Sequence, residues 1–359
     1  MPRVTRRAFV EAAATMSGAL HLVEPVHACA ATSATVAARQ PTEDPRPGAT
    51  VMTVRGRVSA ADVGMTLVHE HVLVDFVGAD TVSPDRYDRD DAYRKALPHL
   101  RQVYGLGVRT LVECTPAYLG RDPQLLVRLS QATDLHIVTN TGYYGAADDR
   151  FVPAHAYDES ARALADRWIA EWRDGIDGTE VRPGFMKIGV DPGPLSAIDR
   201  KLVEAAAITH AATGLAIASH TGDGVAAHEE LDVLASRDIP LQAFIWVHAQ
   251  SEKDIDVIRR AAQRGAWISL DGISASSADR HVELVLALAD GGLLRQVLVS
   301  HDAGWYRVGE PDGGEYRPHD AMFTHVLPRL RERLGDAGVT QLLVDNPARA
   351  LAIDSGRAR

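Results

Sequence analysis

One apolar stretch decides the fold: Thr66-Leu67-Val68-His69-Glu70-His71-Val72-Leu73-Val74-Asp75. Its branched and apolar residues predict a β-strand, on which alternate side chains point to the same face. His69 and His71 therefore project together, while Glu70 points the other way. Two imidazoles side by side on a rigid strand make half of a metal site. Two histidines on a solvated strand face would show the same pattern. The rest of the sequence is therefore needed to distinguish a metal site from this alternative.

Strand-like apolar runs recur along the chain and alternate with helical patterns. They lie near residues 65–75, 108–114, 135–143, 184–190, 214–220, 241–248, 265–271 and 296–301. Helical spacing of apolar residues separates them, as in 158–172 and 200–212. This alternation predicts an α/β fold, the (β/α)8 TIM barrel. A doubly wound sheet is the rival, but neither a G-x-G-x-x-G motif nor a phosphate-binding loop follows the first strand.

Metal-capable side chains stand in or at the ends of these runs. Lys187 lies in the fourth run, and His220, His248 and Asp302 end the fifth, sixth and eighth. The C-terminal ends of barrel strands form one face, so these residues should meet the two histidines of the first strand. Singly, each has an ordinary explanation as a hydrogen-bonded core histidine, a lysine that reaches solvent, or a helix cap. Together they predict a metal site.

Lys187 is an unusual metal ligand, because an ammonium group has no lone pair. Burial in an apolar strand beside metal ions favours the neutral amine. That amine can react with carbon dioxide to give a carbamate, whose two oxygens can bridge two metals. The sequence therefore makes Lys187 a candidate carboxylated lysine.

In their order along the chain, these motifs resemble those of the phosphotriesterase family in the amidohydrolase superfamily. The resemblance covers residues 51 to about 354 and includes the segments 64–71 and 344–351. It implies a metal-dependent hydrolase barrel that holds two divalent ions, with zinc expected and manganese, cobalt or iron open. The implied ligands are His69, His71 and Asp302 for the buried metal, His220 and His248 for the more exposed metal, and carbamylated Lys187 with a hydroxide as bridges.

The mechanism implied by this resemblance is attack by the metal-bridging hydroxide on an ester or phosphoryl centre. Asp302 is the best candidate to take or relay the proton. No serine or cysteine nucleophile is required. Cys114, inside the second apolar run, is expected to be a small packed residue.

Substrate choice has fewer signals. Tyr143 and Tyr144 close the third run, where lactone-cleaving members of the family place a tyrosine that faces the metals; packing is the alternative. After the seventh run, Gly272 stands where organophosphate-cleaving members carry histidine and lactonases commonly carry arginine. Both the usual proton relay and the usual lactone contact are therefore missing at this position.

The loop of residues 303–320 is expected to contribute a substrate wall. Trp305 and Tyr306 lie in it among glycines, which suits a mobile lid at the mouth of a barrel. A disordered insertion is the alternative.

The expected function is hydrolysis of a carboxylic ester or lactone, with phosphotriesterase activity as a side reaction. A dedicated phosphotriesterase is the first alternative, and a non-catalytic barrel that holds metal or ligand is one of another class. A mononuclear deaminase is disfavoured by Lys187. A net charge of −10 argues against nucleic acid and anionic membranes. The expected partner is the small-molecule ester, lactone or phosphotriester substrate. No apolar run beyond the first thirty residues has the length of a membrane span, and the resemblance suggests a homodimer.

The N-terminus has the pattern of a targeting signal. Arg6 and Arg7 precede Phe9 and an alanine-rich run, as in a twin-arginine export signal, which predicts a periplasmic or extracellular protein. Cleavage is expected near Cys29, which is a poor candidate for a lipid anchor, and an ordinary N-terminal helix is the alternative. The expected organisation is an export signal in residues 1–30, a disordered linker in 31–50 and the barrel in 51–359.

Deletion of residues 1–30 should leave a folded, active enzyme, because an export signal is not part of the fold. Soluble yield and turnover of the shortened chain, compared with those of the full chain, test this. An insoluble product would contradict the boundary.

Overall fold

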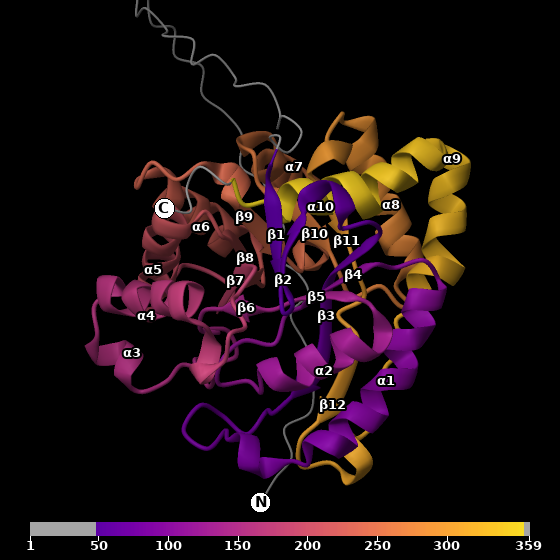
Figure 1. Cartoon of the computed structure of the whole chain (residues 1–359). Coiled ribbons are helices and arrows are strands. Elements are labelled where there is room, and N and C mark those ends of the chain that lie inside the picture. The colour runs from indigo at the N-terminus through magenta and orange to yellow at the C-terminus, as the bar shows by residue number, and fades with distance from the viewer. Residues whose placement is uncertain (1–47, 355–359) are drawn as a thin grey trace, which may run out of the picture. The chain divides into compact units, whose positions relative to one another are not determined.

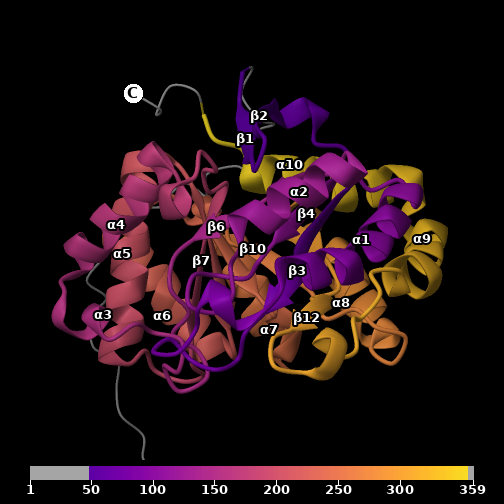
Figure 2. The ribbon, with the colours of Figure 1, turned by 60° about the horizontal axis from the view of Figure 1, so that its bottom comes forward.

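The computed structural model describes residues 48–354. The expected export signal and most of the expected linker lie outside these residues. Within them, parallel strands form the centre and helices surround it (Figures 1 and 2). None of the helices in this part of the chain is both long enough and apolar enough to cross a membrane.

The barrel strands coincide with the apolar runs of the sequence. They are β3 (Thr66–Val74), β4 (Thr110–Glu113), β5 (His136–Val138), β6 (Asn140–Thr141), β7 (Phe185–Val190), β8 (Ala216–Thr221), β9 (Phe244–Val247), β10 (Trp267–Leu270) and β11 (Val297–Val299). The third run contributes β5 and β6 as two pieces. Neighbours pair in parallel in the orders β3-β4-β5 and β6-β7-β8-β9-β10-β11. The predicted (β/α)8 TIM barrel is confirmed.

The barrel closes between β3 and the residues that follow β11. The backbone N–H of Asp302 donates to the carbonyl of His69 at 3.0 Å, and that of His71 donates to the carbonyl of Ala303 at 2.9 Å. Closure therefore places Asp302 directly beside the H-x-H motif.

Helices cover the outside of the strands (Figure 1). They are α1 (Arg89–Gly105), α2 (Pro123–Thr133), α3 (His155–Asp158), α4 (Ala161–Asp174), α5 (Ala197–Thr213), α6 (Gly224–Ala235), α7 (Ile255–Arg264), α8 (Ala278–Asp290), α9 (Leu327–Thr340) and α10 (Asn346–Leu351), with π-helical turns η8 (Met322–Val326) and η9 (Gln341–Asp345). In α4 the side chain of Ser160 caps the first turn, and Leu164 and Trp168 are buried. The apolar stripe expected in this region is thus the face that α4 packs against the barrel.

Apolar side chains fill the barrel interior below the strand ends. Val112, Phe185, Ala218, Ile245 and Leu298 come from different strands and are all buried in one cluster. This packing closes the lower part of the barrel, so polar groups gather at the C-terminal ends of the strands.

The structure adds three strands that the apolar pattern did not predict. β1 (Thr50–Thr53) and β2 (Gly56–Ser59) form an antiparallel hairpin, and β12 (Gly304–Arg307) pairs in parallel with β3. The segment after Asp302 is therefore ordered, and the alternative of a disordered insertion was wrong. Backbone hydrogen bonds to β3, together with the buried Tyr306 and Tyr316, hold this segment as an edge strand and its return.

Candidate metal centre

The six side chains predicted as metal ligands line one cavity of about 90 Å³. His69 and His71 come from β3, Lys187 from β7, His220 from β8, His248 from the end of β9, and Asp302 from the end of β11. The barrel topology therefore brings together every ligand that the sequence suggested.

The spacing of the ligand atoms suits divalent cations. Nε2 of His69 and Nε2 of His71 lie 3.3 Å apart, and Oδ1 of Asp302 lies 3.1 Å from the latter. The ring of His248 is centred 5.1 Å from that of His69 and 4.4 Å from that of His220. Histidine nitrogens and a carboxylate that converge in this way form a ligand set for zinc or a similar transition metal.

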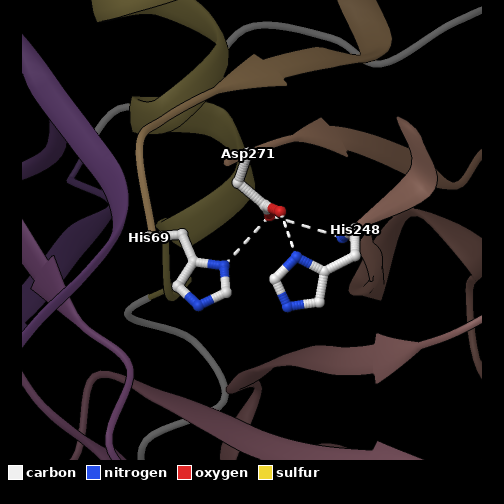
Figure 3. Close-up of side chains that lie close together, drawn as sticks. All are labelled: His69, His248 and Asp271. Atoms are coloured by element: carbon white, nitrogen blue, oxygen red, sulfur yellow. Dashed lines mark hydrogen bonds and ion pairs between the residues drawn. The ribbon is translucent and has the colours of Figure 1, made fainter. Parts of the chain in front are cut away.

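One buried carboxylate orients two of the imidazoles. Asp271, just after β10, accepts a hydrogen bond from Nδ1 of His69 at 3.0 Å and another from Nδ1 of His248 (Figure 3). Both rings thereby keep Nε2 free for a metal, the arrangement usual for metal-binding histidines. Burial alone would raise the pKa of Asp271, but His248 and His69 outweigh it and hold that pKa well below its usual value.

Asp271 was not predicted to have a role, although the sequence holds a signal for it. Asp271 ends the seventh apolar run, so the rule that picked out the other strand ends applies to it as well. The neighbouring Gly272 has a φ of 85°, and a Cβ there would lie 3.2 Å from Nε2 of Gln250. That amide donates to Asp271 at 3.2 Å. Glycine therefore leaves room for Gln250 to support the carboxylate.

His71 is oriented through a hydroxyl group. Its Nδ1 lies 2.8 Å from Oγ1 of Thr115, which in turn donates to the buried carboxylate of Glu113. The ring nitrogen Nε2 again faces the cavity. Thr115 and Glu113 were not predicted from the sequence either, because neither would touch the metal.

Two of the candidate histidine ligands have lowered pKa values, which suits metal binding, and a third has a raised pKa. Burial lowers the pKa of His69 to about 4 and that of His220 well below its usual value, so both rings carry a free lone pair at neutral pH. Burial also lowers the pKa of His248, but Asp271 outweighs it and the pKa is raised. Metal binding at His248 therefore competes with protonation more than it does at His69 or His220.

Lys187 fits the carbamate chemistry. Its side chain is only 2% exposed, and Nζ has no hydrogen-bond partner among residues 48–354. Burial lowers its pKa, which favours the neutral amine. An orphaned buried amine among four imidazoles and a carboxylate is what a carboxylated, metal-bridging lysine requires. The residues present therefore fit a pair of divalent ions.

The four aromatic residues expected at the substrate divide into two pairs. Tyr144 and Trp305 line the cavity, and Oη of Tyr144 lies 2.9 Å from Nδ1 of His220. Tyr143 instead contacts His155 and packs on the helices.

Tyr306 is turned away from the cavity as well, with its ring buried against Gly313. In each pair of neighbours, only Tyr144 and Trp305 line the cavity. The expected substrate contacts of Tyr143 and Tyr306 are corrected on this ground.

Cys114 borders the cavity as a packed residue. It is buried, and burial raises the pKa of its thiol well above the usual value, so it stays protonated. This placement agrees with the expectation from the sequence.

A larger cavity of about 510 Å³ lies against the loops that follow β3 and β4. Among its charged side chains, Arg89 is paired with Asp122 and Arg121 with Glu171. None of the six predicted ligands lines it. We therefore assign the chemistry to the smaller cavity.

Known proteins are similar to this chain in sequence and architecture. Residues 49–351 match the family described as the phosphotriesterase family. The phosphotriesterase homology protein of Escherichia coli is 30% identical over 290 residues, which are 79% of this chain and 97% of that protein. The aryldialkylphosphatase of Saccharolobus solfataricus is 28% identical over 310 residues, covering 81% and 95% of the two chains. A mutant of a PTE-like lactonase from Deinococcus radiodurans superposes with a TM-score of 0.75 at 27% identity, covering 84% and 100%.

Proposed function

The chain belongs to the phosphotriesterase family, and on that premise we propose that this metal-dependent hydrolase is a binuclear enzyme that cleaves a carboxylic ester or lactone. Phosphotriester hydrolysis is proposed as a weaker side reaction. Zinc is the proposed metal, because imidazole and carboxylate ligands suit it.

The size of the cavity is the observation that supports an ester or lactone as the substrate. Its volume of about 90 Å³ has room for a small reacting group, with Tyr144 and Trp305 as walls. A lactone presents a flat carbonyl in a small ring, whereas a phosphotriester presents a tetrahedral centre with three substituents. The likeness to a PTE-like lactonase points the same way.

The two metals would lower the pKa of a shared water and polarise the carbonyl oxygen of the substrate. Asp302 would take the proton from the attacking water, a role supported by its place among the candidate metal ligands. Burial alone would raise its pKa, but His69 and His71 outweigh it and lower the pKa, so the group is ionised at neutral pH.

Tyr144 is the other group at the cavity that can handle a proton. Burial raises the pKa of Tyr144, so its hydroxyl keeps its proton and can donate a hydrogen bond to an oxygen of the substrate. This contact would stabilise negative charge as it develops on that oxygen.

A dedicated phosphotriesterase remains the alternative, supported by the likeness to an aryldialkylphosphatase. Gly272 does not distinguish the two, since glycine supplies neither a proton relay nor a contact to a lactone.

Metal content and substrate preference should be measured on one preparation. We expect close to two metals per chain by elemental analysis after growth with zinc. Lactones or aryl esters should turn over at least about tenfold faster than phosphotriesters in kcat/KM, and a chelator should abolish all turnover. Dominant phosphotriester turnover would favour the alternative. Fewer than about one metal per chain, with no turnover, would contradict the proposed enzyme.

A further inference from the structure

Glu70 lies between the two histidines of the H-x-H motif and points to the opposite face of β3, where its carboxylate is fully buried. Oε1 accepts hydrogen bonds from Oγ of Ser300 at 2.7 Å and from the backbone N and Nδ1 of His301 at 3.0 and 2.8 Å. Oε2 accepts from the backbone N of Ala303 at 3.0 Å and from Nδ1 of His319 at 2.9 Å. A carboxyl group that faces only donors acts as an acceptor, which means that it is ionised.

Two of these donors belong to the residues directly before and after Asp302, which are His301 and Ala303. Asp302 has a φ of 52°, in the left-handed region that side-chain-bearing residues seldom adopt. Such a conformation persists only where its surroundings hold it. Glu70 supplies that hold, because it binds the backbone N–H groups of both neighbours, His301 and Ala303.

The same carboxylate also joins the two ends of the segment that carries Trp305. Ala303 begins this segment and His319 lies near its end, and both donate to Oε2 of Glu70. Between them, Arg317 donates to the carbonyl of Asp302 and lies over the ring of Trp305 at 4.4 Å. Asp302 and the Trp305 wall are therefore held as one unit.

We propose that Glu70 is a positioning residue that fixes Asp302 and Trp305 relative to the metal ligands on its own strand. It contacts neither substrate nor metal. Because side chains alternate along β3, His69 and His71 face the cavity while Glu70 anchors the end of the eighth strand from behind. This inference rests on the proposed catalytic role of Asp302.

A metal site at Glu70 is the competing interpretation. Glu70, His301 and His319 are buried, and their ligand atoms lie within 4.8 Å of one another. However, Nδ1 of each histidine is already hydrogen-bonded to Glu70, and Nε2 of His301 accepts from the backbone N of Met322 at 3.1 Å. This geometry favours a hydrogen-bonded anchor over a metal site.

Glu70→Gln tests the anchor, because the amide has the same shape but turns N–H groups toward donors. Hydrogen exchange is measured first on the full chain without metal or substrate. We expect backbone amides of residues 300–320 to exchange at least about tenfold faster, while peptides elsewhere in the barrel are unchanged. At saturating zinc, kcat should fall by about 10- to 100-fold with two metals still bound.

A pair of His319 variants provides the matched control. His319→Asn keeps an N–H donor near the position of Nδ1, whereas His319→Leu removes it. The asparagine variant should retain slow exchange in residues 300–320 and most of kcat, and the leucine variant should resemble Glu70→Gln. If Glu70→Gln does not fold, this pair carries the test alone.

The outcomes separate the possible roles of Glu70. Wild-type exchange and kcat in Glu70→Gln would overturn the proposal, as would faster exchange spread evenly over the barrel, which indicates general stability. A third zinc bound by the wild type and lost in Glu70→Gln would make Glu70 a ligand and also overturn it. Exchange without metal or substrate does not depend on catalysis, so a failure of the proposed hydrolase function would leave that result intact.

Discussion

Lys187→Ala should reduce bound metal from two ions per chain to at most one and lower kcat by about 1,000-fold. The reason is that Lys187 is the proposed bridge between the two metals. Its buried Nζ has no hydrogen-bond partner in the part of the chain that the structure describes. Without a bridge, histidines from β3, β8 and β9 must hold the ions with fewer anionic ligands.

Two further variants separate the amine from its packing. Lys187→Met keeps an unbranched apolar side chain in the barrel and removes only the amine, so it should lose metal and turnover as Lys187→Ala does. Lys253→Ala removes an exposed lysine and should change neither. Mass spectrometry of peptides from gently digested wild type should detect the added mass of one carbon dioxide on Lys187. Two metals and full kcat in Lys187→Met would show that no carbamate is needed.

The barrel and the metal ligands could be predicted together, because both follow from the positions of the apolar runs. Apolar runs of strand length fix the strands, and parallel strands in a barrel place their C-terminal ends on one face. A polar residue at the end of a run is thus located in space by its place in the sequence. His220, His248 and Asp302 were found in this way, whereas His69 and Lys187 were found as polar residues inside the first and fourth runs.

Residues that act through a ligand were harder to predict. Thr115 contributes by a hydrogen bond to His71, and Glu113 by accepting a hydrogen bond from Thr115. Side-chain contacts of this kind leave no periodic signal in the sequence. Asp271 did end an apolar run, but its contact with His69 spans 202 residues and gives it a role only in the folded chain.

Side-chain orientation and the pairing of the edge strand were also hard to predict from the sequence. Whether Tyr143 or Tyr144 faces the metals depends on the register of a strand that breaks in two at Thr139. β12 is short and glycine-flanked, and it becomes a strand because it pairs with β3. Tertiary pairing of this kind overrides local propensity.

Asp302→Asn should lower kcat by about 1,000-fold while the barrel stays folded, because asparagine has the shape of aspartate but cannot accept a proton. Oδ1 of Asp302 lies 3.1 Å from Nε2 of His71 and 3.7 Å from that of His69. An amide oxygen can still ligate a metal at this position. Elemental analysis should therefore find most of the metal retained, and circular dichroism should find an unchanged melting transition.

Comparison with Asp271→Asn distinguishes a base from an orienting group. Asp271 acts by fixing His69 and His248, so its loss should weaken metal binding by about 10- to 100-fold, and added zinc should restore most of kcat. Added zinc should not restore Asp302→Asn, because the missing function is proton transfer.

The pH dependence of kcat gives a further test of Asp302 as the base. The pKa of Asp302 is lowered by His69 and His71 against the effect of burial, so the carboxylate is ionised at neutral pH and the resting enzyme becomes protonated there only at low pH. Wild-type kcat at saturating zinc should therefore stay level through neutral pH and decline as the pH falls through this lowered pKa. Asp302→Asn should lack that decline over the range in which metal stays bound. A restored kcat with zinc, or an unchanged acid limb in Asp302→Asn, would assign proton transfer to another group, and Tyr144 would be the first to examine.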